Sequence, residues 1–197
     1  GRLRVLFGAR QVDARLPALP GAHQFANSAL AIAMLMAQDH VTLSTQALIE
    51  APAGARWPAR LQSMAPGPLT APIADRIVTL DGGHNVNCAM ALARHFHGGR
   101  RQALIMGMLA NKDAAGWLRA MAGSIACVIP VPIDGHDHHP PATLAAMAEA
   151  MGIPAECARD LPHAVQIAAG TGDTPVLIAG SLYLAGTALR LNQQYPE

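Results

Sequence analysis

Lysine is almost absent from this 197-residue sequence, in which Lys112 is the only example. Because Asp113 follows Lys112, the sequence contains no G-x-x-x-x-G-K-[ST] phosphate-binding loop. Aromatic residues make up only 4% of the chain, and 14 Lys and Arg residues nearly balance 13 Asp and Glu residues without any basic block. Proteins that bind nucleic acid need clustered cations, so the composition argues against a nucleic-acid partner.

Cysteine and long apolar runs are also scarce. The three cysteines, Cys88, Cys127 and Cys157, lie far apart without a C-x-x-C pair, so we expect reduced thiols that behave as small apolar residues. No apolar run approaches the roughly 20 residues of a membrane span, and the N-terminus has no signal-peptide core. These absences predict a soluble, cytoplasmic protein without a membrane partner. The chain begins with Gly1 rather than Met, which indicates a processed chain or a piece of a longer one.

The hydrophobic residues, 51% of the chain, are sufficient for a real core and divide into two patterns. The first fifty residues predict a strand at 5–7, a turn-rich stretch through Gly21, and a helix at 24–38 with apolar residues three and four apart. The segment Ala51–Pro58 has the composition of a linker. We therefore expect two domains, at residues 1–54 and 55–197.

The second pattern alternates short apolar strands with helices. The expected strands are 76–80, 103–107, 125–131 and 175–179, and the expected helices are 87–96, 114–122, 143–151, 162–169 and 182–191. This alternation predicts an α/β fold with a doubly wound, mostly parallel sheet. Ligands of such sheets bind beyond the carboxyl ends of the strands, so the residues directly after each strand are the functional candidates.

Two candidate groups flank the start of the second domain. Asp81-Gly82-Gly83-His84-Asn85 follows the first strand and opens a helix, so its carboxylate can bond a ribose diol while the glycines and helix start admit an anion. A plain strand–turn–helix connection is the alternative. Arg60 follows the linker and is either a bidentate phosphate contact or a solvated arginine.

Two further residues have open interpretations. Asn27 lies in the first turn of the first-domain helix, where its amide either reads an adenine edge or takes part in ordinary capping. Lys112 follows the second strand of the sheet, where it neutralises phosphate, pairs with Asp113 or lies in solvent.

Two other motifs are weaker candidates for a metal site or a catalytic nucleophile. The loop His136-Asp137-His138-His139 has metal-ligating side chains but no second cluster, so we interpret it as a polar surface loop and expect no metal site. Ser181 does not stand in a G-x-S-x-G motif, so a nucleophilic serine is not expected.

Five motifs, taken in order, resemble one family. They are G-A-H-Q-F-A-N-S-A-L-A at 21–31, W-P-A-R-L-Q at 57–62, D-G-G-H-N at 81–85, G-M-L-A-N-K-D at 107–113 and G-S-L-Y-L-A-G at 180–186. Together they resemble the folylpolyglutamate synthase/dihydrofolate synthase family of the ATP-dependent Mur ligase superfamily, and they extend over nearly the whole chain.

The resemblance implies that residues 1–54 are the tail of a central ATP-binding domain and residues 55–197 a Rossmann-like C-terminal ligase domain. It implies that Asn27 contacts adenine, Arg60 the phosphates and Asp81 the ribose, with His84 near the phosphates and Lys112 a phosphate or substrate contact. The family's phosphate loop, magnesium ligands and carbamylated lysine have no match here. We therefore assign no catalytic residue and expect this chain alone to be inactive.

The implied reaction joins L-glutamate to dihydropteroate or a folate, with ATP and Mg²⁺, through an acyl phosphate. Two positions depart from the family pattern: Ala59 replaces the glycine before the arginine, and Val86 replaces the proline after D-G-x-H-N. The residues alone also allow a non-catalytic nucleotide- or metabolite-binding module, or a metal-binding protein built on the histidine loop.

Overall fold

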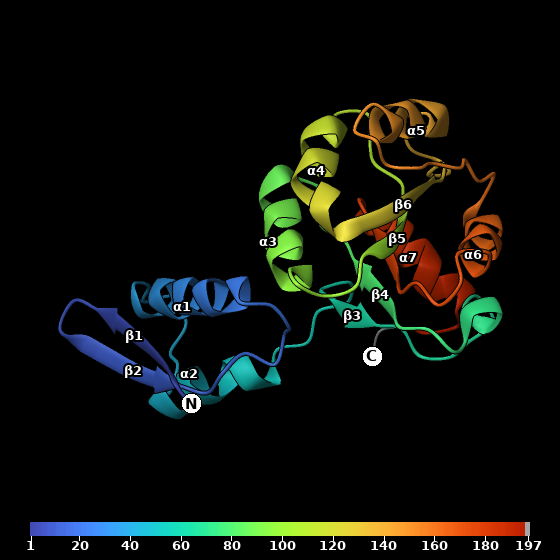
Figure 1. Cartoon of the computed structure of the whole chain (residues 1–197). Helices are drawn as coiled ribbons and strands as arrows, with labels where there is room; N and C mark the ends of the chain where they lie inside the picture. The colour runs from blue at the N-terminus through green and yellow to red at the C-terminus, as the bar shows by residue number, and fades with distance from the viewer. Residues whose placement is uncertain (196–197) are drawn as a thin grey trace. The chain divides into compact units, whose positions relative to one another are not determined.

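The computed structural model describes residues 1–195, so the last two residues of the expected second domain lie outside the described part. The chain forms two compact units, Gly1–Pro58 and the part from Ala59 onward (Figure 1). The first unit contains a two-stranded sheet and the second a five-stranded one. Each unit has its own hydrophobic core.

The first unit is an antiparallel hairpin packed with two helices. Its elements are β1 (Leu3–Phe7), β2 (Arg10–Ala14), α1 (His23–Met36) and α2 (Thr45–Gly54). Val5 pairs with Val12 across the hairpin, and both side chains are buried against Ile32 of α1 and Leu48 of α2. The predicted helix at 24–38 therefore exists, with its end two residues earlier.

Two predictions for this unit are wrong. Residues 10–14, expected to be turn-rich, form β2 because pairing with β1 satisfies their backbone groups and buries Val12. The expected linker starts too early, since residues 51–54 belong to α2. Ser44 caps that helix through the Ala47 N–H, and Pro52 is tolerated because it lies in the last turn, with its ring buried.

The second unit is the predicted doubly wound, mostly parallel sheet. Its strand order is β3-β4-β7-β5-β6, in which only the short edge strand β3 is antiparallel. The strands are β3 (Gln62–Ser63), β4 (Val78–Asp81), β5 (Gln102–Met106), β6 (Ile125–Pro130) and β7 (Val176–Ala179). The helices are α3 (Val86–Phe96), α4 (Ala114–Met121), α5 (Pro141–Glu149), α6 (Leu161–Ala169) and α7 (Leu182–Leu191), with short 3-10 turns at Ala71–Ile73 and Ala122–Ser124.

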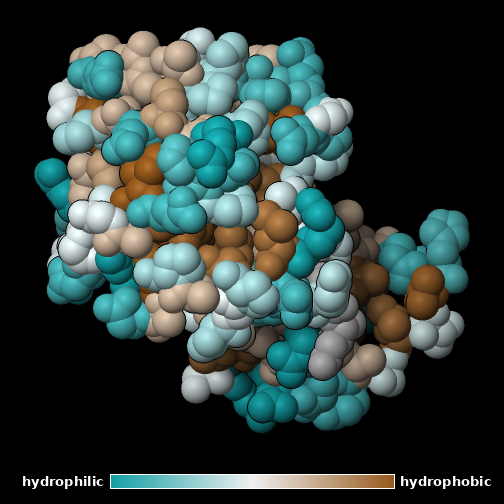
Figure 2. All heavy atoms as spheres, turned by 90° about the vertical axis from the view of Figure 1, so that its right-hand side faces the viewer, coloured by the Kyte–Doolittle hydropathy of each residue, from teal (hydrophilic) through white to brown (hydrophobic). Residues whose placement is uncertain are grey.

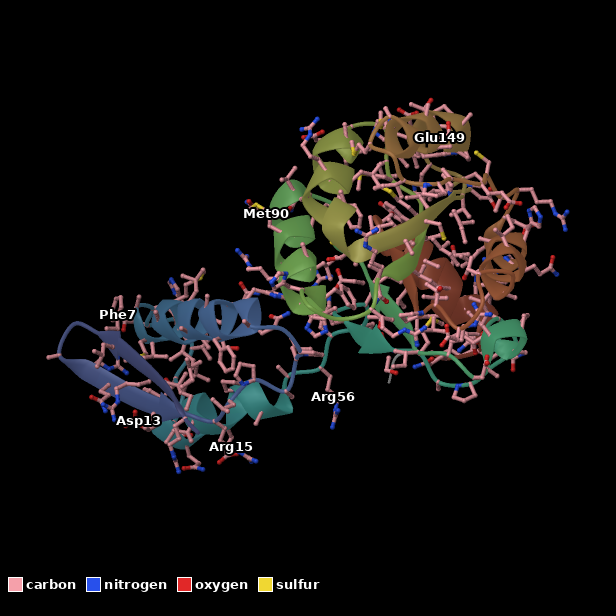
Figure 3. The ribbon with its side chains drawn as sticks, viewed as in Figure 1. Phe7, Asp13, Arg15, Arg56, Met90 and Glu149 are labelled. Carbon is pink, nitrogen blue, oxygen red and sulfur yellow. The ribbon has the colours of Figure 1, made fainter. Side chains whose placement is uncertain are left out.

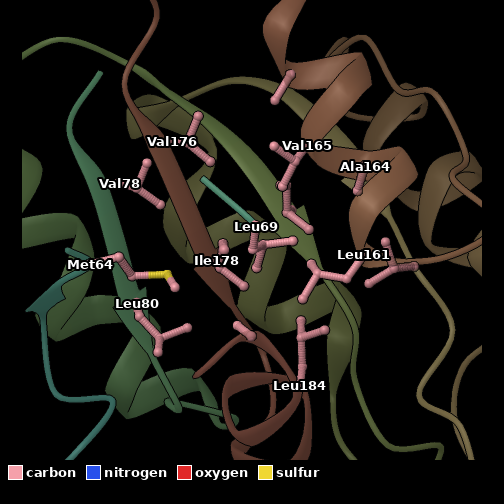
Figure 4. Close-up of a cluster of buried hydrophobic side chains, with 14 of the residues drawn as sticks. Met64, Leu69, Val78, Leu80, Leu161, Ala164, Val165, Val176, Ile178 and Leu184 are labelled. Atoms are coloured by element: carbon pink, nitrogen blue, oxygen red, sulfur yellow. The ribbon is translucent and has the colours of Figure 1, made fainter. Parts of the chain in front are cut away.

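The sheet is covered on both faces because its central strands are apolar on both sides. On β7, Val176 and Ile178 pack with α6 and α7, as the close-up in Figure 4 shows. Leu177 and Ala179 point to the opposite face and pack with α3, α4 and α5. Over the face seen in Figure 2, hydrophilic side chains are interspersed with apolar ones. No helix within residues 1–195 is long and apolar enough to cross a membrane.

Arg76, expected to begin the first strand of the sheet, lies before it and caps a helix instead. Its side chain is only 7% exposed and donates hydrogen bonds to the carbonyls of Ala168 at 2.6 Å and Ala169 at 2.7 Å. These are carbonyls of the last turn of α6, where a cation also offsets the negative end of the helix dipole.

We expect Arg76→Leu to lower the free energy of unfolding by about 2 kcal/mol, because two charge-assisted bonds are lost and the Ala169 carbonyl loses the donor that Arg76 supplies. Urea unfolding followed by circular dichroism measures this difference. Arg101→Leu, at an exposed position, is the control and should stay within about 0.5 kcal/mol of the wild type. Equal midpoints for the two variants would contradict the capping role.

Candidate functional site

The carboxyl ends of four parallel strands meet at one edge of the second unit's sheet. Asp81 of β4 pairs with Ala179 of β7, which pairs with Met106 of β5, so the residues that follow these strands lie next to one another. Gly180 has φ +106°, and a Cβ atom there would lie 2.7 Å from the carbonyl oxygen of Gly107. Glycine is therefore required for the ends of β7 and β5 to come this close.

Asp81, the expected ribose ligand, is buried at this edge with 5% of its surface exposed. Its Oδ1 accepts a hydrogen bond from the Gly83 N–H at 2.7 Å, and its Oδ2 accepts one from the Leu61 N–H at 2.8 Å. The carboxylate thus joins the glycine loop after β4 to the segment that contains Arg60.

Arg60 lies in a tight turn beside that loop. Ala59 and Leu61 on either side of it have positive φ angles of 54° and 46°, a region that favours glycine. Ala59 occupies the position where the family that the sequence resembles has glycine, a residue that adopts such a φ without strain. The Ala59 carbonyl accepts bonds from the Gly82 N–H at 2.9 Å and the Arg60 Nη1 at 3.0 Å. A Cβ on Gly82 would be 3.4 Å from that Nη1, so the guanidinium lies over the glycine.

His84 and Asn85 complete the loop. The His84 Nδ1 is 3.0 Å from the Gly82 carbonyl oxygen, and donates to it when that nitrogen carries the proton. The Asn85 Oδ1 accepts from the Cys88 N–H at 2.9 Å and caps α3, of which Val86 is the first residue. Proline is common at this first helical position, and Val86 fills it without changing the cap. The structure therefore brings Arg60, Asp81 and His84 together around two glycines at a helix start.

Two residues that support this loop were missed by the sequence interpretation. Trp117 of α4 is fully buried, and its Nε1 donates to the Gly83 carbonyl at 3.2 Å. The Gln62 Oε1 accepts from the Ala59 N–H at 2.8 Å. Gln62 stands two residues after the arginine of the W-P-A-R-L-Q motif, a spacing that points to it in retrospect, whereas Trp117 shows only the apolar pattern of a core position.

Lys112 lies in the neighbouring loop, after β5. One of its expected interpretations, an ion pair with Asp113, does not hold in the described part of the chain. The Asp113 carboxylate accepts from the Gly116 N–H and caps α4, and within the described residues it forms no ion pair with Lys112. The Lys112 carbonyl oxygen is 2.8 Å from the His139 Nε2, so a hydrogen bond connects the loops after β5 and β6. Lys112 itself is half-buried at the same edge of the sheet.

The histidine loop is organised by its own contacts. His136 stacks on Tyr183 with ring centroids 3.7 Å apart, and the His138 Nδ1 is 2.7 Å from the His136 carbonyl oxygen. Within residues 1–195, no three His, Cys, Asp or Glu side chains converge as a metal site would require. All three cysteines are free, and burial, helped by Glu156, raises the pKa of the Cys127 thiol.

Asn27 belongs to the first unit, where it is exposed on α1. Its Nδ2 donates to the Gln24 Oε1 at 3.0 Å, and the Gln24 Nε2 in turn lies 3.0 Å from the His23 Nε2. Because Gln24 is only 4% exposed, it fixes the orientation of the Asn27 amide at the start of the helix.

Several solved structures share this fold. Over 98% of the chain it is similar to folylpolyglutamate synthase from Mycobacterium tuberculosis, complexed with ADP and AMPPCP, with a TM-score of 0.77 and 27% identity. It is also similar to the bifunctional folylpolyglutamate synthase/dihydrofolate synthase of Yersinia pestis, at a TM-score of 0.72 and 24% identity over 93% of the chain. The Thermotoga maritima folylpolyglutamate synthase has a TM-score of 0.66 and 22% identity over 94% of the chain.

The chain corresponds to less than half of each of these proteins, namely 48%, 42% and 42% of their lengths. No protein-family model matches the sequence, and no curated protein matches it. The expected resemblance and fold class are thus confirmed by structure: the second unit has the fold of a ligase-related C-terminal domain like that of folylpolyglutamate synthase.

Proposed function

We propose that this chain is the C-terminal portion of an ATP-dependent amide ligase that adds L-glutamate to dihydropteroate, folates or both. The observation that carries the proposal is the cluster of Arg60, Asp81 and His84 around Gly82 and Gly83, at the strand edge where such sheets bind ligands. In support, the similar M. tuberculosis synthase is complexed with ADP and AMPPCP.

In this proposal the edge holds the nucleotide. The glycines admit phosphate to the backbone, Arg60 supplies a planar cation, and His84 lies next to them. Asp81 lies on the ribose side, Lys112 contributes a phosphate or substrate contact from the next loop, and Asn27 of α1 contacts the adenine. The described residues contain no convergent carboxylates for Mg²⁺, so magnesium binding is assigned to other parts of the complete enzyme.

The proposed chemistry has two steps. The γ-phosphoryl group of ATP passes to a carboxylate of the pteroate or folate, which gives an acyl phosphate and ADP. The amino group of glutamate then attacks the acyl carbon, a C–N bond forms, and inorganic phosphate leaves. The residues of this chain bind and orient the nucleotide and oppose the charge on the transferring phosphoryl group.

The surface of the first unit supports its assignment as the remnant of a larger ATP-binding domain. Leu30 and Met34, one helical turn apart on α1, are 62% and 64% exposed, and Leu6 of β1 is 68% exposed. Exposed apolar side chains of this size on a small unit are typical of surfaces that other parts of a protein cover.

We expect the chain alone to bind ATP with a Kd no tighter than about 1 mM and to show no ATP turnover. Such affinity corresponds to roughly −4 kcal/mol, and the few contacts here must offset an immobilisation cost of about 4–15 kcal/mol. NMR titration and an ADP-release assay measure both quantities. Micromolar affinity or turnover by the isolated chain would contradict the assignment as a ligase portion, and would favour a self-sufficient nucleotide-binding module or enzyme.

A further inference from the structure

The Asp81 carboxylate is bonded through both oxygens to the protein backbone. Its partners are the Leu61 N–H at 2.8 Å, next to Arg60, and the Gly83 N–H at 2.7 Å, in the glycine loop. With only 5% of the residue exposed, these two bonds are its principal contacts in the described chain. Each oxygen accepts one bond and keeps a further acceptor site, so this carboxylate connects two backbone segments whether or not it also contacts a ribose.

The backbone around Arg60 is of a kind that requires such support. Ala59 and Leu61 are buried and adopt φ angles of 54° and 46°, which residues with a Cβ rarely adopt. Conformations of this kind persist only where the surroundings hold them, and they gather at functional sites. Three bonds hold this turn: Gly82 N–H to the Ala59 carbonyl, Ala59 N–H to the Gln62 Oε1, and Leu61 N–H to the Asp81 Oδ2.

We propose that Asp81 is a positioning residue for Arg60, assisted by Gln62, and that it affects the binding of a nucleotide's phosphates through the Arg60 turn, a role that does not depend on the ribose. The inference rests on the proposed function, in which this edge binds the phosphates of a nucleotide. A carboxylate suits the position because both of its partners are donors. An amide side chain has one acceptor oxygen and would direct its NH₂ group at one of the two N–H groups.

The decisive variant is Asp81→Asn in the 197-residue chain, tested by NMR titration with two probes, ATP and inorganic triphosphate. The positioning role predicts that both probes bind about tenfold more weakly, the loss expected when one charge-assisted phosphate contact is misplaced. Removal of a negative charge would by itself tighten the binding of an anion, so the two effects have opposite signs. Weaker binding of ATP alone, with triphosphate unchanged or tighter, would overturn the proposal in favour of a ribose contact.

Two further variants sharpen the result. Asp113→Asn removes a charge from the same sheet edge without touching the turn, and it should leave triphosphate binding unchanged or slightly tighter. The double variant Arg60→Ala with Asp81→Asn should bind triphosphate no more weakly than Arg60→Ala alone, because both changes remove the same contact. Independent, additive losses would overturn the proposal.

Hydrogen exchange of the ligand-free chain separates failure of this inference from failure of the proposed function. In Asp81→Asn the Leu61 amide should exchange at least about tenfold faster, while the amides of β7 keep their protection. An unchanged Leu61 amide would overturn the positioning role, whether or not ATP binds. If the complete enzyme releases no ADP when it is given ATP, glutamate and a folate or dihydropteroate, the proposed function fails, and the exchange rates of this chain still decide the role of Asp81.

Gln62→Ala is a second, milder test if Asp81→Asn does not fold. It removes only the acceptor of the Ala59 N–H from a half-buried side chain. Binding of ATP and of triphosphate should weaken by the same factor, about threefold. A variant that binds both probes as the wild type does would contradict the support that Gln62 is inferred to give.

Discussion

Arg60→Ala in the complete enzyme is expected to lower kcat by about 10²–10³-fold, the loss measured when one donor to a developing charge is removed. The physical reason is that the charge Arg60 opposes grows on the phosphoryl group as it transfers. An interaction that is stronger in the transition state than in the ground state changes kcat more than it changes KM. The position of the guanidinium over Gly82, fixed by its bond to the Ala59 carbonyl, makes this residue the strongest candidate for that role.

Steady-state kinetics on the full-length enzyme test this expectation with two companion variants. Arg60→Lys keeps the charge but loses the planar fork, so we expect an intermediate loss of about tenfold. Arg56→Ala is the matched control, because Arg56 is an exposed arginine four residues earlier, on the segment after α2 (Figure 3). It should leave kcat and KM unchanged. A rise in KM for ATP at constant kcat in Arg60→Ala would instead assign Arg60 to ground-state binding.

Much of the second unit could be predicted because its sequence is consistent at several levels. Each of the four parallel strands is a short, mostly apolar run with most of its residues buried. Asp113 and Asp160, of a residue type that favours helix starts, cap the helices that follow. The last helix spans the predicted residues, Leu182–Leu191. These signals are local, so each can be read within a few residues of sequence.

The elements that were missed depend on partners distant in the sequence or on small differences between favourable and unfavourable local contributions to the free energy. Gln62–Ser63 is too short to show a strand pattern and exists through its pairing with β4. Pro52 indicates a linker by composition, but the burial of Leu48 and the Ser44 cap outweigh its cost near a helix end. In both cases tertiary contacts decide what propensity leaves open.

The location of the candidate site could be predicted from the sequence, but the hydrogen bonds within it could not. Parallel strands place Asp81, Gly107 and Gly180 at one edge, and this follows from topology alone. The Leu61 N–H donates to Asp81, twenty positions later in the sequence, from a turn with positive φ angles. No residue pattern in the sequence indicates this turn or this bond. The bond from Trp117 to Gly83 is equally hidden, because a buried tryptophan is first of all a core residue.

Trp117→Ala is expected to lower the free energy of unfolding by about 3–5 kcal/mol, the range for truncating a large buried ring. Trp117 is fully buried among α3, α4 and the sheet, so removal leaves a cavity that the surrounding side chains fill only in part. The Gly83 carbonyl also loses its donor. Urea unfolding followed by circular dichroism measures the change.

Matched variants separate the two contributions of this side chain. Trp57→Ala removes the same ring from a position that is 63% exposed, and should change the free energy of unfolding by less than about 0.5 kcal/mol. Trp117→Phe keeps most of the apolar volume but removes the Nε1 donor. It should therefore cost less than Trp117→Ala, while the NMR signals of Gly82 and Gly83 still shift because the loop has lost its anchor. Unchanged glycine signals in Trp117→Phe would show that Trp117 acts through packing alone and does not anchor the loop. Equal losses of stability in Trp57→Ala and Trp117→Ala would contradict the assignment of Trp117 to the core.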